Sequence, residues 1–239
     1  MPLPKIATPT YELELPSTGA SINYRPFLVK EEKVLVIALE SEDNKQITTA
    51  IKSVLKNCIL SKGIKVEDLP TFDIEYLFLN IRGKSVGEDL EVNIICPDDE
   101  KTQVPVTIAL DEIEVQKDDN HTNKIKIDDS IMMEMKYPSL EQFIKNNFDF
   151  NEKNMMDQSF DLIATCIDKV YTEDEVWTAA DCTKKEMRDF LEQMNSQQFK
   201  EIETFFETMP KLSHTINVTN PKTKVKSDVV LEGLSSFFA

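Results

Sequence analysis

The sequence predicts an α+β protein in which helices and strands occupy separate stretches of the chain. Apolar residues recur at three- and four-residue spacing over roughly residues 30–85, which indicates helices. Between residues 88 and 136 the period changes to two, in short β-branched runs. From Pro138 the helical spacing returns. We therefore divide the 239 residues into an N-terminal segment 1–87, an antiparallel β module 88–137 and a C-terminal segment 138–239.

The N-terminal segment is predicted to begin with a hairpin and to continue with helices. The run YELELPSTGASINYRPF, residues 11–27, alternates polar and apolar side chains around Ser17-Thr18-Gly19, which is typical of a hairpin. Ser41 or Asp43 can cap the second helix, because either side chain can accept a hydrogen bond from a free amide of its first turn. Helical spacing covers three stretches: 30–41, 44–60 and 70–85.

Two predicted hairpins share one layout, in which a proline-containing turn joins two short strands. The first, VNIICPDDEKTQVPVTIAL at residues 92–110, has Cys96-Pro97 at its turn. The second, INVTNPKTKVKSDVVLEGL at residues 216–234, has Asn220-Pro221 there. Ribbons of this shape bind zinc through a second cysteine three residues after the first, and Asp99 occupies that place. We therefore expect ribbon-like hairpins without a metal, held by strand pairing and by prolines that fix the turns.

The C-terminal segment is predicted to be a helical bundle closed by the second ribbon-like hairpin. The run SQQFKEIETFFETMPKL, residues 196–212, provides the last helix of the bundle, and Pro210 ends it. A short helix over LEGLSSFF, residues 231–238, follows the hairpin. Three pairs of residues have the spacing of a helix capping box: Ser139 with Gln142, Thr172 with Glu175, and Thr183 with Glu186.

The composition excludes two classes of partner. The formal net charge is −16, whereas nucleic-acid binding needs clustered Lys and Arg, and an anionic membrane surface also attracts basic segments. No run of eighteen apolar residues occurs, and the first residues lack the continuous apolar stretch of a signal peptide. We expect a soluble protein that does not insert into a membrane, with its four scattered cysteines as buried thiols in a reducing cytoplasm.

No residue pattern predicts catalysis or a cofactor. His121 lies in a charged turn and His214 just before a strand, and neither accompanies the local signature of a nucleophile. None of the five glycines belongs to a run that could cradle a phosphate. We therefore expect no catalytic, cofactor-binding or metal-binding residues, and a protein that acts through its surface.

Two short motifs are candidates for partner binding. Arg25-Pro26-Phe27 stands where the predicted hairpin ends and the first helix begins, and we expect Phe27 to be buried and Pro26 to fix the chain direction. Phe237 and Phe238 end the chain with two phenyl rings that are costly to expose. These rings either pack onto the helical bundle or bind a partner.

Four stretches give the chain a resemblance to a known family. They extend from Pro4 to Phe238 and read PKIATPTYELELPSTG, INYRPFLVKEEKVLVIALES, LPTFDIEYLFLNIRGKSVGE and LEGLSSFF. In these stretches the chain resembles the baseplate hub protein family of T4-like contractile-tailed bacteriophages. The ribbon hairpins of similar tail proteins can carry cysteine pairs, and this sequence departs from that pattern at Asp99, Asn220 and Thr223.

The resemblance implies a non-enzymatic role in building the central hub of the tail baseplate through protein–protein contacts. The implied partners are other baseplate hub and tail proteins of the phage, and an oligomeric place within the hub is one option. The implied location is the host cytoplasm during assembly or the tail of the virion. A permanent subunit and an assembly chaperone both fit this reading. A phage-encoded cell-wall hydrolase or another hub enzyme is the alternative, and the missing catalytic constellation counts against it.

Overall fold

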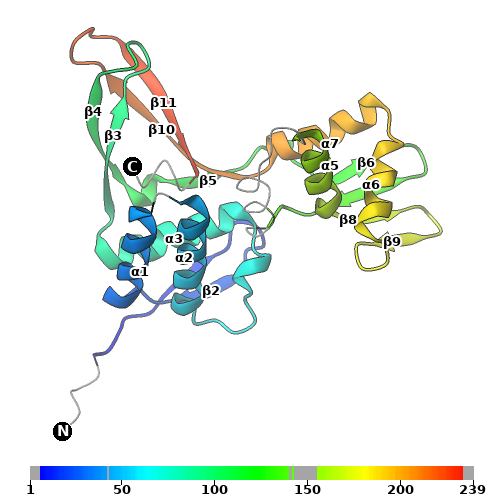
Figure 1. Cartoon of the computed structure of the whole chain (residues 1–239), viewed down its shortest axis with the longest axis horizontal. Coiled ribbons are helices and arrows are strands. Elements are labelled where there is room, and N and C mark those ends of the chain that lie inside the picture. Colours follow the sequence, from blue (N-terminus) through cyan, green and yellow to red (C-terminus); the bar gives the residue numbers. More distant parts are fainter. Residues whose placement is uncertain (1–5, 42, 140–141, 143–154, 234–239) are drawn as a thin grey trace. The chain divides into compact units, whose positions relative to one another are not determined.

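The computed structural model describes residues 6–41, 43–139, 142 and 155–233, and it confirms the α+β class (Figure 1). The described residues form six α-helices and four small antiparallel sheets. No helix among them is both long and apolar enough to cross a membrane. The helices are α1 (Val29–Glu40), α2 (Asn44–Cys58), α3 (Thr71–Val86), α5 (Met155–Cys166), α6 (Lys184–Glu192) and α7 (Ser196–Thr208), with 3-10 turns at Val66–Asp68 and Leu110–Glu112.

The strands pair in four separate groups. The sheets have the strand orders β1-β2, β3-β4, β11-β10-β5 and β6-β7-β8-β9. The strands are β1 (Tyr11–Glu14), β2 (Ser21–Tyr24), β3 (Asp89–Ile95), β4 (Gln103–Ala109), β5 (Glu114–Gln116), β6 (Lys124–Lys126), β7 (Met132–Met135), β8 (Ile167–Tyr171), β9 (Val176–Thr178), β10 (Lys211–Thr219) and β11 (Lys226–Glu232).

Contacts between residues group the chain into two compact units. Unit 1 comprises Met1–Val66, Phe72–Gln116 and Lys211–Ala239, and unit 2 comprises Glu67–Thr71 and Lys117–Pro210. The strands between residues 88 and 136 are therefore divided between the units and do not form the single β module that we expected. The division of the chain into segments 1–87, 88–137 and 138–239 stays a prediction.

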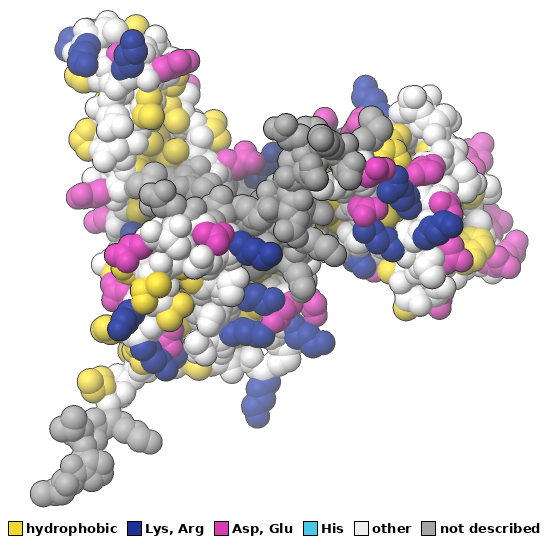
Figure 2. Space-filling model, viewed as in Figure 1, with side chains coloured by type: hydrophobic (Ala, Val, Ile, Leu, Met, Phe, Trp, Pro, Cys, Tyr) yellow, Lys and Arg dark blue, Asp and Glu magenta, His cyan; other side chains and the backbone are white. Residues whose placement is uncertain are grey.

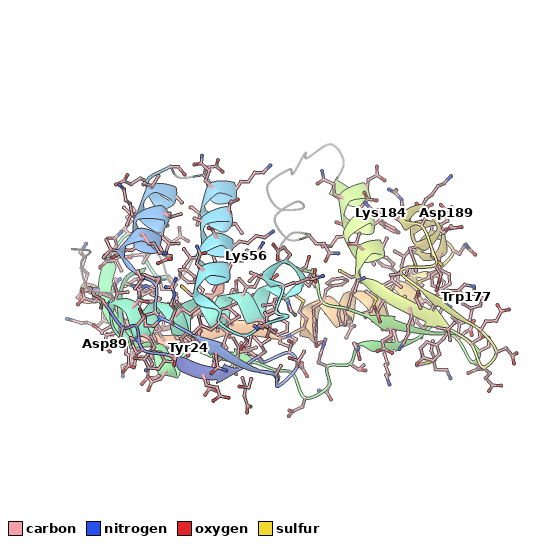
Figure 3. All side chains as sticks on the ribbon, turned by 90° about the horizontal axis from the view of Figure 1, so that it is seen from below. Tyr24, Lys56, Asp89, Trp177, Lys184 and Asp189 are labelled. Atoms are coloured by element: carbon pink, nitrogen blue, oxygen red, sulfur yellow. The ribbon has the colours of Figure 1, made fainter. Side chains whose placement is uncertain are left out.

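Unit 1 begins with the β1–β2 hairpin and packs it with three helices. Tyr11 pairs with Tyr24 and Glu14 with Ser21, so the turn lies at Ser17-Thr18-Gly19 as its sequence indicated. Tyr24 lies at the end of β2 and is labelled in Figure 3. Asp43 is the cap of α2, because its carboxylate accepts a hydrogen bond from the Lys45 amide at 2.9 Å.

The second part of unit 1 consists of the two ribbon-like hairpins, β3–β4 and β10–β11. Strand β5 adds to β10, which gives the three-stranded sheet. Apolar side chains from both ribbons form one core with Leu79 of α3, because alternate residues of each strand point inward. The buried members of this core are Leu79, Leu90, Val92, Ile94, Ile108, Ile113, Leu212, Ile216, Val218 and Leu231.

Unit 2 corrects the predicted C-terminal bundle, because its helices share their core with a sheet. Residues Ile167–Tyr171 form strand β8, which pairs with β7 on one side and with β9 on the other. Trp177 lies on β9 at the outer edge of this sheet (Figure 3). The common core of α5, α6, α7 and the sheet is formed by Ile125, Ile127, Met133, Met135, Ile163, Ala164, Cys166, Ile167, Val170, Met187, Leu191, Ile202 and Phe205.

The helix start predicted at Thr172 is wrong because the three-residue spacing of a capping box also occurs in turns between strands. Thr172 and Glu175 have capping-box spacing, yet they form the turn between β8 and β9, where the Thr172 hydroxyl accepts from the Glu175 amide at 3.1 Å. Thr183 and Glu186 do form a capping box, at the start of α6. One of the three predicted helix starts is therefore a hairpin turn, because Ser and Thr hydroxyls cap turns as well as helices.

Candidate partner-binding surface

Helix α1 of unit 1 carries apolar side chains on its solvent-facing side as well as on its inner side. Only Glu31, Leu35 and Ala38 of this helix are buried. Around them the surface is lined by large apolar residues, which together we call the α1 face (Figure 2). The α1 face consists of Leu28, Val29, Val34, Val36, Ile37 and Leu39, with exposed fractions from 38% to 79%.

The α1 face has the geometry of a helix that docks into a groove. Val29 and Val36 are seven residues apart, so they lie one above the other on the same side of the helix. Ile37 extends the apolar surface around the helix, and Lys33 and Glu40, four residues after Val29 and Val36, place charges between these side chains. A surface helix of a soluble protein normally presents a polar outer face, so the exposed Val29, Val36 and Ile37 on the outer side of α1 indicate a second contact surface.

The motif Arg25-Pro26-Phe27 positions α1 from inside unit 1. The Arg25 guanidinium bonds the Glu31 carboxylate at 3.0 Å and the Pro26 carbonyl at 2.8 Å. The Phe27 amide donates to the Ser85 hydroxyl of α3 at 2.9 Å. Pro26 and Phe27 are buried, as we expected for Phe27. The motif therefore faces the interior and fixes the start of α1, and its direct contact with a partner stays a prediction.

Glu31 performs two tasks at the first turn of α1. Its carboxylate accepts from the Leu28 amide at 2.8 Å, which satisfies a free helix N–H where the cap residue has no polar side chain. It also forms the ion pair with Arg25, and its own side chain is 3% exposed. Burial acts to raise the pKa of Glu31, but the hydrogen bonds from Arg25, Leu28 and Lys30 outweigh burial and lower it. Glu31 is therefore charged at neutral pH.

The turns of the two ribbons have matching backbones. In the first, the Glu100 amide donates to the Cys96 carbonyl at 2.9 Å, and in the second the Lys224 amide donates to the Asn220 carbonyl at 2.9 Å. Glu100 and Lys224 both have positive φ, 53° and 67°. The second turn thus reproduces the first with Asn220 in the place of Cys96, which agrees with the shared layout in the sequence.

Hydrogen bonds join the turn of the β3–β4 hairpin to the turn of the β10–β11 hairpin. In a zinc-binding ribbon the metal ion would lie at such turns. The Asn220 side-chain amide donates to the two Asp98 carboxylate oxygens at 3.0 and 3.1 Å, and the Thr223 hydroxyl donates to the same carboxylate. Bonds from Thr223 and Asn220 lower the pKa of Asp98. The bonds from Thr102 hold the pKa of Asp99 far below its usual range. A metal is not needed to explain why the turns stay together.

Replacing the buried Asn220 by alanine should lower the free energy of unfolding by about 1–3 kcal/mol, because the carboxylate of Asp98 and two turn amides lose a partner together. Asn220 is 1% exposed, and its carbonyl oxygen accepts from the Lys222 amide at 2.9 Å. Urea denaturation measures the change. Asn217→Ala is the matched control, because the exposed Asn217 side chain donates to Asp228 across the hairpin, and it should change the value by about 0.5 kcal/mol or less. Equal effects of the two variants would contradict the role of Asn220.

Burial changes the titration of three cysteines and of one histidine. Burial raises the pKa of Cys58 to about 11 and of Cys166 to about 12, and it also raises the pKa of Cys96. These thiols stay protonated at neutral pH, which is unfavourable for a nucleophile or a metal ligand. Burial lowers the pKa of His121, whose ring nitrogens contact the hydroxyls of Thr208 and Tyr137 at 2.9 and 3.0 Å.

A metal site would need several ligands at one place. In the part of the chain that the structure describes, no three His, Cys, Asp or Glu side chains are grouped to hold a metal ion. The expectation of no bound metal stays a prediction. Phe237 and Phe238, and most of the helix expected over residues 231–238, lie outside the described residues.

A comparison with models of known protein families shows to which family the chain belongs. The model of the family described as T4 bacteriophage base plate protein matches residues 8–239. The chain belongs to this family. No curated protein and no solved structure matches the chain. Membership of this family makes the chain a structural protein of the phage baseplate, with other baseplate proteins as its partners and the virion tail as the location that the family indicates.

Membership of a baseplate family offers an explanation for the exposed apolar residues of the α1 face. A protein built into or onto a multiprotein baseplate needs apolar surface that is covered only in the assembly. The six exposed apolar residues of the α1 face are a candidate for such a surface. Sequence reasoning placed a helix here but missed its outer face, although the run VKEEKVLVIALE has more apolar residues than one buried side requires.

Proposed function

We propose that this protein acts in the hub of the baseplate, as a subunit or an assembly factor, through protein–protein contacts and without enzymatic activity. The α1 face is its main docking surface in this proposal. The observation that carries it is the exposure of six large apolar side chains on one helix whose start is fixed by a buried ion pair. The raised thiol pKa values of Cys58, Cys96 and Cys166 support the non-enzymatic part of the proposal.

The partner surface that fits the α1 face is an apolar groove in another baseplate protein. Val29 and Val36 would enter it as anchors two helical turns apart, with Ile37 beside them. Burying one such aliphatic side chain contributes about 1.5–3 kcal/mol. The charges of Lys33 and Glu40 would lie among these anchors, so the partner groove needs polar or oppositely charged groups opposite them.

The double variant Val29→Glu/Val36→Glu should bind its baseplate partner at least about 100-fold more weakly, which corresponds to about 2.7 kcal/mol. Its thermal stability should stay close to that of the original protein, since both valines are exposed, by 79% and 47%, and glutamate is a good helix former. The measurement is titration calorimetry against each other baseplate protein of the same phage, after co-expression has identified which of them forms a complex.

The matched control changes two equally exposed valines elsewhere. Val176 on β9 and Val230 on β11 are 58% and 59% exposed. The variant Val176→Glu/Val230→Glu adds the same two charges and should keep full affinity. Equal loss in both double variants would attribute the effect to net charge, and unchanged affinity in the α1 variant would refute the α1 face as the docking surface.

The two roles within the proposal differ in what the finished particle contains. A subunit buries a permanent interface and stays at fixed stoichiometry in purified virions, whereas an assembly factor is present in infected-cell lysate and absent from virions. Quantitative mass spectrometry of both samples separates them. A hub role is refuted if the protein forms no complex with any hub protein in either sample.

A further inference from the structure

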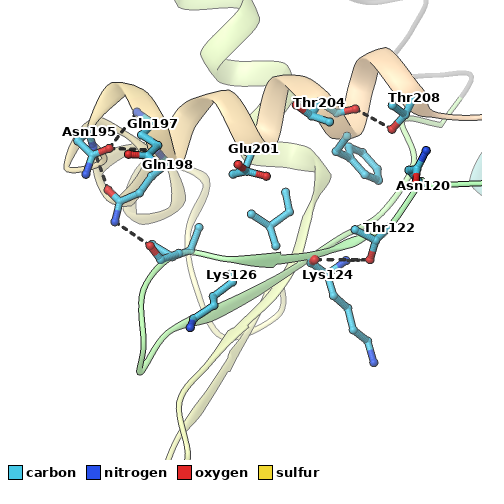
Figure 4. Close-up of a pocket in the computed structure, with 13 residues that line it drawn as sticks. Asn120, Thr122, Lys124, Lys126, Asn195, Gln197, Gln198, Glu201, Thr204 and Thr208 are labelled. Atoms are coloured by element: carbon cyan, nitrogen blue, oxygen red, sulfur yellow. Dashed lines mark hydrogen bonds between the residues drawn. The ribbon is translucent and has the colours of Figure 1, made fainter. Parts of the chain in front are cut away.

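Unit 2 contains a groove between the edge strand β6 and helix α7 (Figure 4). Its volume is about 620 Å³. Helix α7 presents a polar stripe to it, at positions three and four residues apart: Gln197, Gln198, Glu201, Thr204 and Thr208. The opposite wall is the strand, because β6 is the first strand in the order β6-β7-β8-β9 and has no neighbour on its outer side among the described residues.

The register of β6 against β7 shows which backbone N–H and C=O groups of β6 point away from the sheet. Met135 donates to the Asn123 carbonyl at 2.7 Å, and Ile127 donates to the Ile131 carbonyl at 3.0 Å. Residues 123, 125 and 127 therefore bond toward β7, so the N–H and C=O groups of Lys124 and Lys126 point away from the sheet. These outward groups are what a further strand would bond.

The outward backbone groups of Lys124 and Lys126 differ in their hydrogen bonds. The Lys124 amide donates to the Thr122 hydroxyl at 3.1 Å, a local bond that closes this end of the edge. At Lys126 neither outward backbone group has a hydrogen-bond partner within the described residues. Gln198 of α7 donates to the Ile127 carbonyl at 2.9 Å and holds the helix beside the strand end. The open edge is short, and it lies directly beside the groove.

The charged side chains on the outer face of β6 indicate which kind of strand could pair with it. Lys124, Glu134 and Lys169 are cross-strand neighbours on this face, and Glu134 bonds Lys169 at 3.0 Å. Among the described residues Lys124 forms no ion pair, and the ion pair of Lys126 with Asp129 is exposed and weak. The face is basic although the whole chain has a net charge of −16. An incoming strand is favoured if it places carboxylates opposite these lysines.

A second copy of this chain is a poor occupant. Antiparallel pairing of two β6 strands about Ile125 would place Lys124 of one copy directly opposite Lys126 of the other. Like charges in directly opposed positions destabilise a strand pair. A segment of another protein avoids this conflict.

We propose that the β6–α7 groove binds an extended acidic segment of another protein, which adds to the sheet as a strand beside β6. Alternate residues of the bound segment face opposite sides, so carboxylates on one side meet Lys124 and Lys126. Residues on the other side lie under the polar stripe of α7, where Glu201 favours a basic or hydroxyl side chain. The site lies in unit 2, and it does not depend on the α1 face of unit 1.

The test uses the full-length protein and two capped eight-residue peptides. In the first, glutamate alternates with threonine and valine, and in the second, lysine replaces every glutamate. The glutamate peptide should bind at least tenfold more tightly by titration calorimetry, and it should slow hydrogen exchange of the Lys126 amide at least tenfold by nuclear magnetic resonance. Equal affinity of the two peptides, or an unchanged Lys126 amide, would overturn the proposal.

Two variants show whether the strand edge is responsible. Lys126→Pro removes the outward N–H and is compatible with an edge strand, so it should abolish binding, while Lys126→Ala keeps the N–H and should only weaken it. If circular dichroism shows that Lys126→Pro is unfolded, Lys124→Glu/Lys126→Glu decides, because it should reverse the preference toward the lysine peptide. An unreversed preference would overturn the proposal.

Two further outcomes would overturn the choice of occupant. A Lys126 amide that is already protected in the free monomer would show that the chain itself fills the edge. A dimer in sedimentation analysis that Lys126→Pro converts to a monomer would show that a second copy fills it. The expected result is a free edge on a chain whose oligomeric state does not change with Lys126→Pro.

Discussion

Replacing Phe27 by alanine is expected to lower the free energy of unfolding by about 3–5 kcal/mol, the cost of truncating a buried phenylalanine. Phe27 is 9% exposed and lies between strand β2 and helix α1, where its amide is held by Ser85 at 2.9 Å. Alanine keeps this backbone hydrogen bond, so the decrease in the free energy of unfolding measures the effect of removing the phenyl ring. Urea denaturation followed by circular dichroism measures the change in the midpoint.

Val29→Ala is the control for Phe27→Ala. Val29 lies two residues further along and is 79% exposed, so its truncation should change the free energy of unfolding by about 0.5 kcal/mol or less. The pair also separates stability from binding, because Val29 belongs to the α1 face and Phe27 does not. If Phe27→Ala leaves the midpoint unchanged while it weakens partner binding, the ring is a partner contact and our assignment of it to the interior is wrong.

The helices of unit 1 were predictable because their signals are local. The observed helices Val29–Glu40, Asn44–Cys58 and Thr71–Val86 follow the stretches whose apolar spacing indicated them. The β1–β2 and β3–β4 hairpins likewise depend on short alternating runs around a turn. Such patterns are set by residues within one element, so a single sequence contains them.

The errors arose where distant residues decide the structure. Strand β8 follows α5 without a break, and its two neighbours β7 and β9 determine that Ile167–Tyr171 is extended. The bond from Asn220 to Asp98 joins residues 122 positions apart, and no local pattern predicts it. The open edge at Lys126 likewise depends on which strands pair, because the same short run would have no free edge in the middle of a sheet.

The candidate surfaces were less predictable than the fold for a related reason. A run rich in Val, Leu and Ile predicts that α1 is a helix, but its apolar residues do not show which of them the rest of unit 1 covers. Only the packing of α1 beside its neighbours leaves Val36 and Ile37 outside while Leu35 and Ala38 are buried. The sequence of this run shows an excess of apolar residues, but only the fold decides which of them stay exposed.

Glu31→Ala is expected to lower the free energy of unfolding by about 3–5 kcal/mol at neutral pH, because it leaves the Arg25 guanidinium without its charge partner in a site that is 14% exposed. It also removes the acceptor of the Leu28 amide at the first turn of α1. Glu32→Ala is the matched control in the same helical turn. Glu32 is only half-buried, so this substitution should cost much less.

The dependence on pH distinguishes the charge of Glu31 from its packing. The pKa of Glu31 is lowered from 4.5 in the folded protein, so the folded state favours the carboxylate. Its contribution is fully present above pH 4.5 and is lost as the pH falls through the folded pKa. The stability difference between the original protein and Glu31→Gln should therefore be largest at neutral pH and should shrink below pH 4.5, because the original residue then becomes neutral as well. A difference that stays constant from pH 7 to pH 3 would mean that Glu31 acts through shape and hydrogen bonding alone, and the charge of the Arg25 pair would then have no part in fixing the start of α1.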